Sequence, residues 1–218
     1  MKNTRQLKTT KFTDSGFGTI IELLNMEGVV QILSTLNDVG AIRWFKLKEL
    51  VRIRNPKYRD AVSELVRCSL ALAEDKGRKS KEPDIIITEL GKELLSFYHR
   101  LEAIPELNTT EKTWVYRAAI LYVLKEFGAA KVGDMRTHMR PYFSLNEIDA
   151  LREEGIVECR LYNSELTQEI NWRDLDQYFL NICELTEKGH KLIPILDEIK
   201  AFGDNILAHE LWKKLEDK

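Results

Sequence analysis

A short segment that occurs twice, 98 residues apart, constrains the fold of this chain of 218 residues more than any other feature. Ile87-Thr88-Glu89-Leu90-Gly91-Lys92 recurs as Leu185-Thr186-Glu187-Lys188-Gly189-His190. Both copies follow an apolar, strand-like run and open a helical pattern. β-Branched residues favour strands, and a threonine at a helix start can accept a hydrogen bond from an amide of the first turn. The segment therefore predicts a strand-to-helix joint in each half of the chain.

The residues upstream of the two joints predict matching series of elements. In the first half we expect a helix ending near Gly40, an extended piece at 41–45, helices at 47–51 and 57–69, and strands at 70–73 and 84–88 around a polar loop at 75–82. In the second half we expect helices at 114–126, 133–139 and 144–154, a strand at 156–161, an insertion at 162–178 and a return strand at 179–185.

The boundary between the two series falls at about residues 104 to 110, where Pro105 stops one helix and Asn108-Thr109-Thr110-Glu111 offers a capping box for the next. The order of elements in each series is that of a winged helix. We therefore expect a mainly α fold with small β-hairpin wings (α+β), arranged as two tandem winged helix-turn-helix domains, residues 1–106 and 107–218.

Two motifs give the chain a resemblance to a known family. They are Asp149-Ala150-Leu151-Arg152-Glu153-Glu154-Gly155-Ile156-Val157, and the Leu-Thr-Glu-Lys-Gly run at 185–189, which is followed by Leu192, Ile195 and Leu196. With these motifs the chain resembles the archaeal and bacterial winged-helix transcription regulators of the MarR-like and HxlR-like kind. The resemblance implies that the first motif leads from a recognition helix into the wing, and that the second opens a terminal helix. Members of the family usually carry one winged helix per chain, whereas two are expected here.

Basic residues are concentrated between Arg43 and Lys81, where 12 Lys and Arg face five Asp and Glu, a net charge of +7 in a chain of net charge −2. Such a local excess favours contact with phosphates. Because winged helices place the second helix of the helix-turn-helix in the major groove and lay the wing on the backbone, the resemblance assigns three sets of DNA contacts. Contacts with base edges are expected from Lys57, Tyr58, Arg59, Ser63 and Arg67, with Asp60 nearby. Contacts with phosphates are expected from Arg52 and Arg54. Contacts by the wing are expected from Lys76, Arg78, Lys79 and Lys81, around Gly77. The alternative is that these basic residues are only a solvated surface.

The second half has the opposite charge on its corresponding helix, which carries Asn146, Glu147, Asp149, Glu153 and Glu154. An acidic face repels the phosphate backbone, so we expect this half not to bind DNA. An apolar stripe near the C-terminus, interrupted at Gly203, instead predicts a homodimer or protein-partner platform. We expect its contacts to be made by Leu196, Ile199, Phe202, Ile206, Leu211 and Trp212. Packing of the same stripe within its own domain is the alternative.

Other classes of site find no support in the sequence. The four histidines lack ligand spacing, and no phosphate-binding loop or nucleophile motif occurs; we therefore expect no enzyme activity, catalytic residue, metal or cofactor. The odd number and wide spacing of Cys68, Cys159 and Cys183 predict three packed thiols. No apolar run approaches the roughly 20 residues that a bilayer span needs, so we expect a cytoplasmic, nucleoid-associated protein with no membrane contact.

These observations lead to a non-enzymatic, sequence-specific regulator that binds double-stranded DNA. Two alternatives stay open at this point. One is a tandem winged-helix adaptor that binds other proteins of the transcription or chromosome-segregation machinery, and the other is a plasmid or viral replication initiator.

Overall fold

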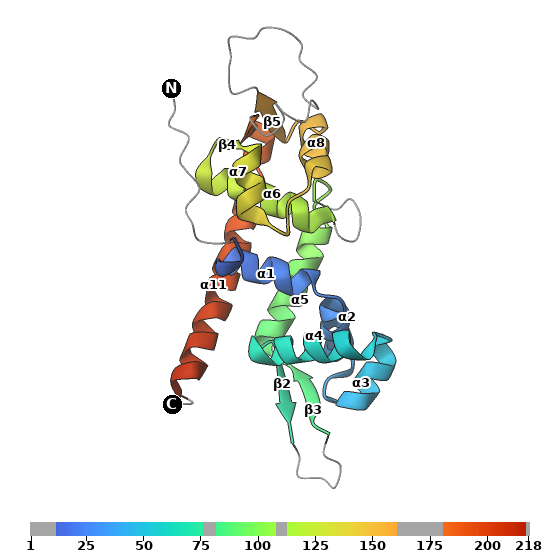
Figure 1. The fold of residues 1–218 in the computed structure, drawn as a ribbon. Helices are drawn as coiled ribbons and strands as arrows, with labels where there is room; N and C mark the ends of the chain where they lie inside the picture. The colour runs from blue at the N-terminus through green and yellow to red at the C-terminus, as the bar shows by residue number, and fades with distance from the viewer. Residues whose placement is uncertain (1–11, 76–81, 108–112, 161–180, 217–218) are drawn as a thin grey trace.

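The computed structural model describes residues 12–75, 82–107, 113–160 and 181–216, with the side chains of 210–216 left aside. It is mainly helical with two small antiparallel sheets (Figure 1). Ahead of the first sheet lie the 3-10 turn η1 (Phe12–Asp14) and the helix α1 (Gly16–Asn25), in which Ser15 accepts a hydrogen bond from the Gly18 amide.

The first half continues with seven elements and a three-stranded sheet. They are α2 (Val29–Val39), β1 (Ile42–Arg43), α3 (Trp44–Val51), α4 (Asn55–Arg67), β2 (Ala71–Glu74), β3 (Asp84–Ile87) and α5 (Glu89–Glu102). The strand order is β1-β3-β2, so the return strand β3 is central. The series of elements expected from the sequence is thus present in this half.

The second half repeats this series and closes with a long helix. Its elements are α6 (Thr113–Phe127), β4 (Ala130–Lys131), α7 (Val132–Met139), α8 (Leu145–Glu153), β5 (Val157–Arg160), β6 (Ile182–Leu185), α10 (Glu187–His190) and α11 (Ile193–Glu216). The strand order β4-β6-β5 matches that of the first sheet. The expected capping box at 108–111 and the whole of the expected insertion at 162–178 lie outside the described residues.

The repeated threonine makes the same contacts in both halves. Thr88 accepts a hydrogen bond from the Gly91 amide at 3.0 Å and donates one to the Ser69 carbonyl at 2.7 Å. Thr186 accepts from the Gly189 amide at 3.2 Å and donates to the carbonyl of Gly155 at 2.7 Å. The predicted strand-to-helix joint is therefore confirmed in both places.

The glycine of the joint is required by close backbone packing. A Cβ built on Gly91 would lie 3.1 Å from the Leu70 carbonyl carbon, and one on Gly189 would lie 3.4 Å from that of Ile156, with the carbonyl oxygens nearer still. Only glycine lets the new helix start so close to the preceding strand connection. The repeated Thr-x-x-Gly pattern thus has a single physical cause.

Element boundaries around the first helix-turn-helix differ from those expected. Helix α4 begins at Asn55 instead of residue 57 and ends at Arg67 instead of residue 69. Proline is tolerated in a first helical turn, where the amide it lacks would have no helical partner, so Pro56 lies inside the helix. The chain leaves α3 through Arg52, whose φ of 51° is left-handed.

The N-terminal elements connect the two halves. Helix α1 crosses α11 in Figure 1, and a Cβ on Gly203 would lie 2.8 Å from the Gly16 Cα. The rings of Phe17 and Tyr122 stack with centroids 4.0 Å apart, which joins α1 to α6. Gly203 lies inside the continuous helix α11, so the expected interruption of the apolar stripe is not a break in the helix. One apolar core runs through both halves.

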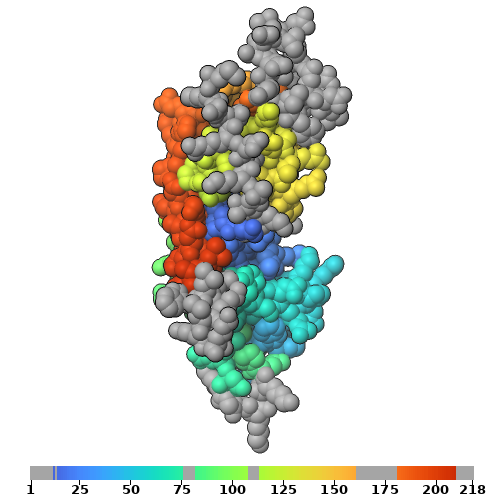
Figure 2. All heavy atoms as spheres, turned by 60° about the vertical axis from the view of Figure 1, so that its left-hand side comes forward, coloured from blue at the N-terminus to red at the C-terminus, as the bar shows by residue number. Residues whose placement is uncertain are grey.

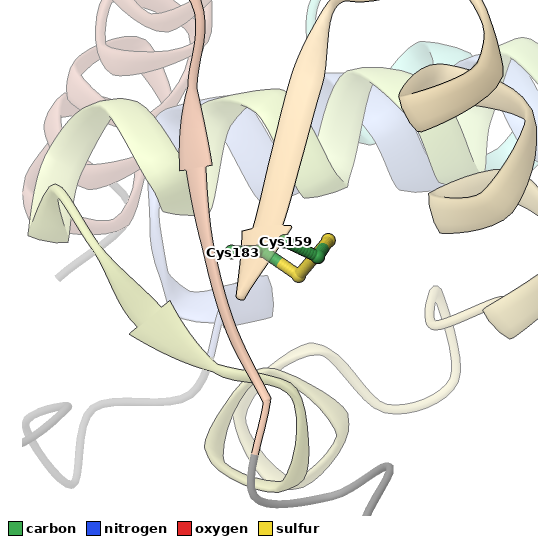
Figure 3. The surroundings of a disulfide bond; sticks show 2 residues. All are labelled: Cys159 and Cys183. Atoms are coloured by element: carbon green, nitrogen blue, oxygen red, sulfur yellow. A yellow bond between two sulfur atoms is a disulfide. The ribbon is translucent and has the colours of Figure 1, made fainter. Parts of the chain in front are cut away.

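Two of the three cysteines are bonded to each other, which corrects the prediction of three packed thiols. Cys159 and Cys183 form a disulfide between the adjacent strands β5 and β6 (Figure 3). Cys68 remains a buried thiol, as expected. The pairing could not be predicted because the two cysteines are 24 residues apart and meet only through the strand register.

Among the described residues, no single helix is long and apolar enough to cross a membrane. Helices α1 and α2 meet the test only as a pair, and they are bent by 80° at the break between them.

Candidate nucleic-acid interface

Helix α4 is held in the first half by its apolar side. Tyr58, Ala61, Val62 and Leu65 are buried in the core. Lys57, Arg59, Asp60, Ser63 and Arg67 are exposed to solvent. The helix therefore presents one polar, mostly basic face, and this face includes every base-edge residue expected from the sequence except one.

The exception is Tyr58, which cannot contact bases because it is fully buried. Its hydroxyl donates a hydrogen bond to the Trp44 carbonyl at 2.7 Å, and the two rings meet edge to face with centroids 4.9 Å apart. Burial, helped by the charge of Glu82, holds the pKa of Tyr58 well above its ordinary value. Its spacing of four and seven residues from Val62 and Leu65 already placed it on the apolar face.

The turn before α4 exposes two arginines. Arg52 caps the end of α3 and Arg54 immediately precedes α4, and both side chains reach solvent. Arg52 also borders a groove of about 920 Å³ between α2, this turn and α5, together with Glu27, Gln31 and His99. The two arginines lie next to the start of the exposed face of α4, as expected.

Ion pairs neutralise part of the charge on α4. Lys57 pairs with Glu27, and Arg67 pairs with Glu64 one helical turn away, with Nε 2.9 Å from a carboxylate oxygen. No such pair occurs for Arg59 within the part of the chain that the structure describes. Exposed ion pairs are weak, typically about 0 to 1 kcal/mol, so an incoming phosphate can displace these carboxylates.

Helix α3 adds exposed groups that the sequence assignment left out. Lys46 is exposed, and so is Arg43 in the short strand before it. Phe45 and Leu50 are apolar yet 51% and 55% exposed. The charge count had included both basic residues, but no role was assigned to them. Their exposure extends the basic surface from α4 to the start of the helix-turn-helix.

The first hairpin projects from the end of the molecule that is remote from the second sheet (Figure 1). Strands β2 and β3 pair over four rungs, from Ala71–Ile87 to Glu74–Asp84. The expected wing contacts Lys76, Arg78, Lys79 and Lys81 lie outside the described residues. The last described residues on either side of them, Asp75 and Glu82, carry exposed carboxylates.

The corresponding helix of the second half has a different surface. The turns Leu65–Leu70 and Leu151–Ile156 are closed by the same backbone hydrogen bond of 2.8 Å, which aligns α4 with α8. In this alignment Glu153 replaces Arg67. Both are exposed, so α8 lacks a basic group at the position where α4 carries one.

Part of the acidity of α8 has a structural role. The side chain of Arg117 in α6 is 3% exposed and donates to Glu147 and Glu154, with each N–O distance 2.8 Å. It also donates to the Glu106 carbonyl at 2.8 Å. Two of the acidic residues assigned to a solvated face thus balance a buried arginine. Arg117 was missed because its surroundings come from three separate segments.

The apolar stripe of α11 is covered within the same chain. Leu196, Ile199, Phe202 and Ile206 are buried, and the ring of Phe202 lies 5.2 Å from that of Phe97 in α5. In Figure 2 the first part of α11 lies flush with the body of the molecule. These four residues are therefore core residues and not an open platform. Helix α11 continues through Leu211 and Trp212, whose side chains lie outside the described residues.

Within the described ranges, no three His, Cys, Asp or Glu side chains are grouped so as to hold a metal ion. The chain matches no protein-family model, no curated protein and no solved structure.

Proposed function

We propose that this chain is a non-enzymatic, sequence-specific DNA-binding protein, a transcription regulator made of two tandem winged helices. The observation that carries the proposal is the arrangement of α4. Its apolar side is anchored in the core, while Lys57, Arg59, Ser63 and Arg67 share the solvent face. A helix held in this way can enter the major groove as a rigid reader.

The groups around α4 support contacts with the DNA backbone. Arg52 and Arg54 at the turn, and Lys46 on α3, provide exposed positive charge beside the reading helix. The sequence between β2 and β3 adds four more basic residues, Lys76, Arg78, Lys79 and Lys81. Phosphate contacts hold a protein in position, and base contacts give its specificity. In this proposal Arg59 and Ser63 read bases, and the flanking arginines hold phosphates.

Binding to duplex DNA, measured by fluorescence anisotropy over a range of salt concentrations, tests the proposal. Replacing Arg59 with alanine is expected to weaken binding to a selected site roughly 5- to 150-fold, because a bidentate base contact contributes about 1–3 kcal/mol. Arg54→Ala should lower the slope of log affinity against log salt by about 0.9. The matched control is Lys92→Ala on α5, whose ammonium pairs with Glu89 at 2.6 Å.

Two results would contradict the proposal: no affinity for any duplex at low salt, or equal losses from Arg59→Ala and Lys92→Ala. Selection of bound sequences from a random pool identifies the site. A set of repeated sites in that selection would favour a replication initiator over a regulator, because initiators assemble on several copies of their site.

The second half serves, in this proposal, as a homodimer or protein-partner platform, and the protein is cytoplasmic and nucleoid-associated. With Leu196 to Ile206 in the core, the platform moves to the last turns of α11, beyond His209. A chain that ends after His209 keeps Ile206 in place and should lose self-association in sedimentation experiments while keeping its DNA affinity. Unchanged association would contradict this assignment.

A protein-binding adaptor is the second candidate, and exposed apolar groups favour it. Val39, Phe45 and Leu50, on α2 and α3, are each at least half exposed. Aromatic and aliphatic groups on a surface often anchor a protein partner. Phe45→Ser combined with Leu50→Ser should abolish partner capture under the adaptor hypothesis. Under the regulator hypothesis the same double variant keeps its specificity for the selected DNA site.

A further inference from the structure

The two cysteines of the disulfide in the second sheet differ in exposure to solvent. Cys183 is on the central strand β6, fully buried, between Ala130 of β4 and Cys159 of β5. Cys159 is on the edge strand and is only half-buried. Figure 3 shows the two cysteines side by side at the end of β5. A reagent from solvent therefore reaches Cys159 first.

The equivalent position of the first sheet has no cross-link. The Cys159–Cys183 rung is two residues from the rung Val157–Leu185, next to the second joint. In the first sheet the rung next to the joint is Ala71–Ile87, and the pair two residues away from it is Ala73–Ile85. At this position the first sheet pairs two apolar side chains without a covalent bond. The fold itself thus does not require a bond at this rung, and the bond is a property added to the second half.

We propose that Cys159 and Cys183 are a site of reversible thiol–disulfide exchange with a small thiol/disulfide couple of the glutathione class. In the reducing direction, a small thiolate attacks the sulfur of Cys159, and the bond to Cys183 breaks. Cys183 leaves as a thiolate and takes up a proton. A second small thiolate then attacks the small-molecule sulfur of the mixed disulfide, and the bond to Cys159 breaks. The small disulfide is released, and Cys159 leaves as a thiolate and takes up a proton.

The overall exchange is balanced in electrons and protons. The protein disulfide and two small thiols become two protein thiols and one small disulfide, so two electrons and two protons pass to the protein. Oxidation is the reverse reaction, in which the small disulfide is the oxidant. Cys68 takes no part because it is buried in the first half. The site exchanges with the same couple whether or not the chain binds DNA.

The two states differ in how firmly β5 and β6 are joined. The bond closes a loop across a separation of 24 residues, and such a cross-link restricts the unfolded chain more than the folded one. We expect the melting temperature of the oxidised protein to exceed that of the reduced protein by roughly 5–10 °C. Amide exchange should slow in β5 and β6 on oxidation and stay unchanged in β2 and β3.

The test equilibrates the full chain in buffers with different ratios of reduced to oxidised glutathione, followed by acid quenching, alkylation and mass spectrometry. The expected result is that the oxidised fraction of Cys159 and Cys183 varies continuously with the ratio. Cys68→Ser is the matched control and should give the same curve. Cys159→Ser should leave Cys183 unbonded and remove the effect of the buffer on both melting and amide exchange.

Three results would overturn the proposal. The first is a bond that survives excess reduced glutathione, which would make it a permanent structural cross-link. The second is a pair that stays reduced in excess oxidised glutathione. The third is a redox effect on melting that persists in Cys159→Ser. The glutathione titration itself is read by mass, so it remains informative even if the serine variant does not fold.

Discussion

The crossing of α1 and α11 gives a sharp test of how the two halves are joined. In an exposed helical position, replacing glycine with alanine stabilises a protein by about 0.5–1 kcal/mol, because alanine loses less backbone freedom on folding. At Gly203 the added methyl would lie 2.8 Å from the Gly16 Cα and nearer still to the Gly16 oxygen. Carbon atoms pack at about 3.5–4.0 Å, so Gly203→Ala must push the helices apart by roughly 1 Å.

The magnitude follows from the side chains along this crossing. Phe17 and Ile20 on α1, and Ile199, Phe202 and Ile206 on α11, are all buried. Full burial of each contributes about 1.5–3 kcal/mol, and a gap of 0.5–1 Å forfeits about a quarter to a half of close contact energy. The loss is therefore about 2–7 kcal/mol. Toward the lower end of this range the net destabilisation is still about 2 kcal/mol after the gain in helix propensity.

Urea unfolding of Gly203→Ala, followed by circular dichroism, measures this change. For a chain of this size a loss of about 2 kcal/mol lowers the melting temperature by roughly 4–8 °C. Ala201→Gly, at an exposed position of the same helix, is the control because it alters helix propensity alone. If the alanine variant is as stable as the wild type, or more so, the close approach of α1 and α11 is refuted.

Three further predictions concern buried polar groups. Arg117→Met should lower the free energy of unfolding by about 3–5 kcal/mol in urea titrations, because it leaves carboxylates without their buried partner; a loss below 1 kcal/mol would contradict this. Tyr58→Phe should cost about 1 kcal/mol of stability through one lost hydrogen bond and leave DNA affinity unchanged; weaker DNA binding at full folding would argue against its buried position. Burial raises the pKa of Tyr122 and of Tyr142 to about 12. Folding favours the neutral form of both tyrosines, so their contribution to stability should be constant below pH 10 and fall as the pH rises toward 12. Tyr122→Phe should make that fall less steep.

The strand-to-helix joints were predictable from sequence because the hydrogen bond that caps each helix joins residues only three positions apart. A threonine at the helix start caps the first turn, and a glycine three residues later lets the helix lie against the preceding connection. The end of the helix before Gly155 was also predictable, because a glycine adopts the left-handed conformation there easily, and its φ is 70°. Repetition of these signals is what made the doubled series of elements visible.

The exposed face of α4 was predicted in part. Arg59 and Ser63 were placed correctly on solvent, but Tyr58 was assigned by its position in the helix and not by its spacing from Val62 and Leu65. A tyrosine has both an apolar ring and a polar hydroxyl. Whether a tyrosine is buried or exposed depends on whether the core offers partners for both its ring and its hydroxyl. Here Trp44 supplies both the ring contact and the hydrogen-bond acceptor.

The sequence by itself determined the two joints, the doubled series of helices and strands, and the clustering of positive charge around α4, because each depends on residues close together in the chain. Only the tertiary structure decided that the stripe of α11 is covered by α1 and α5, that Arg117 holds two carboxylates, and that Cys159 meets Cys183. Those contacts join distant segments, and periodicity specifies an apolar or charged face without specifying what lies against it. The disulfide is the clearest case, since a shift of one residue in the pairing of β5 with β6 would turn the two sulfur atoms to opposite faces of the sheet.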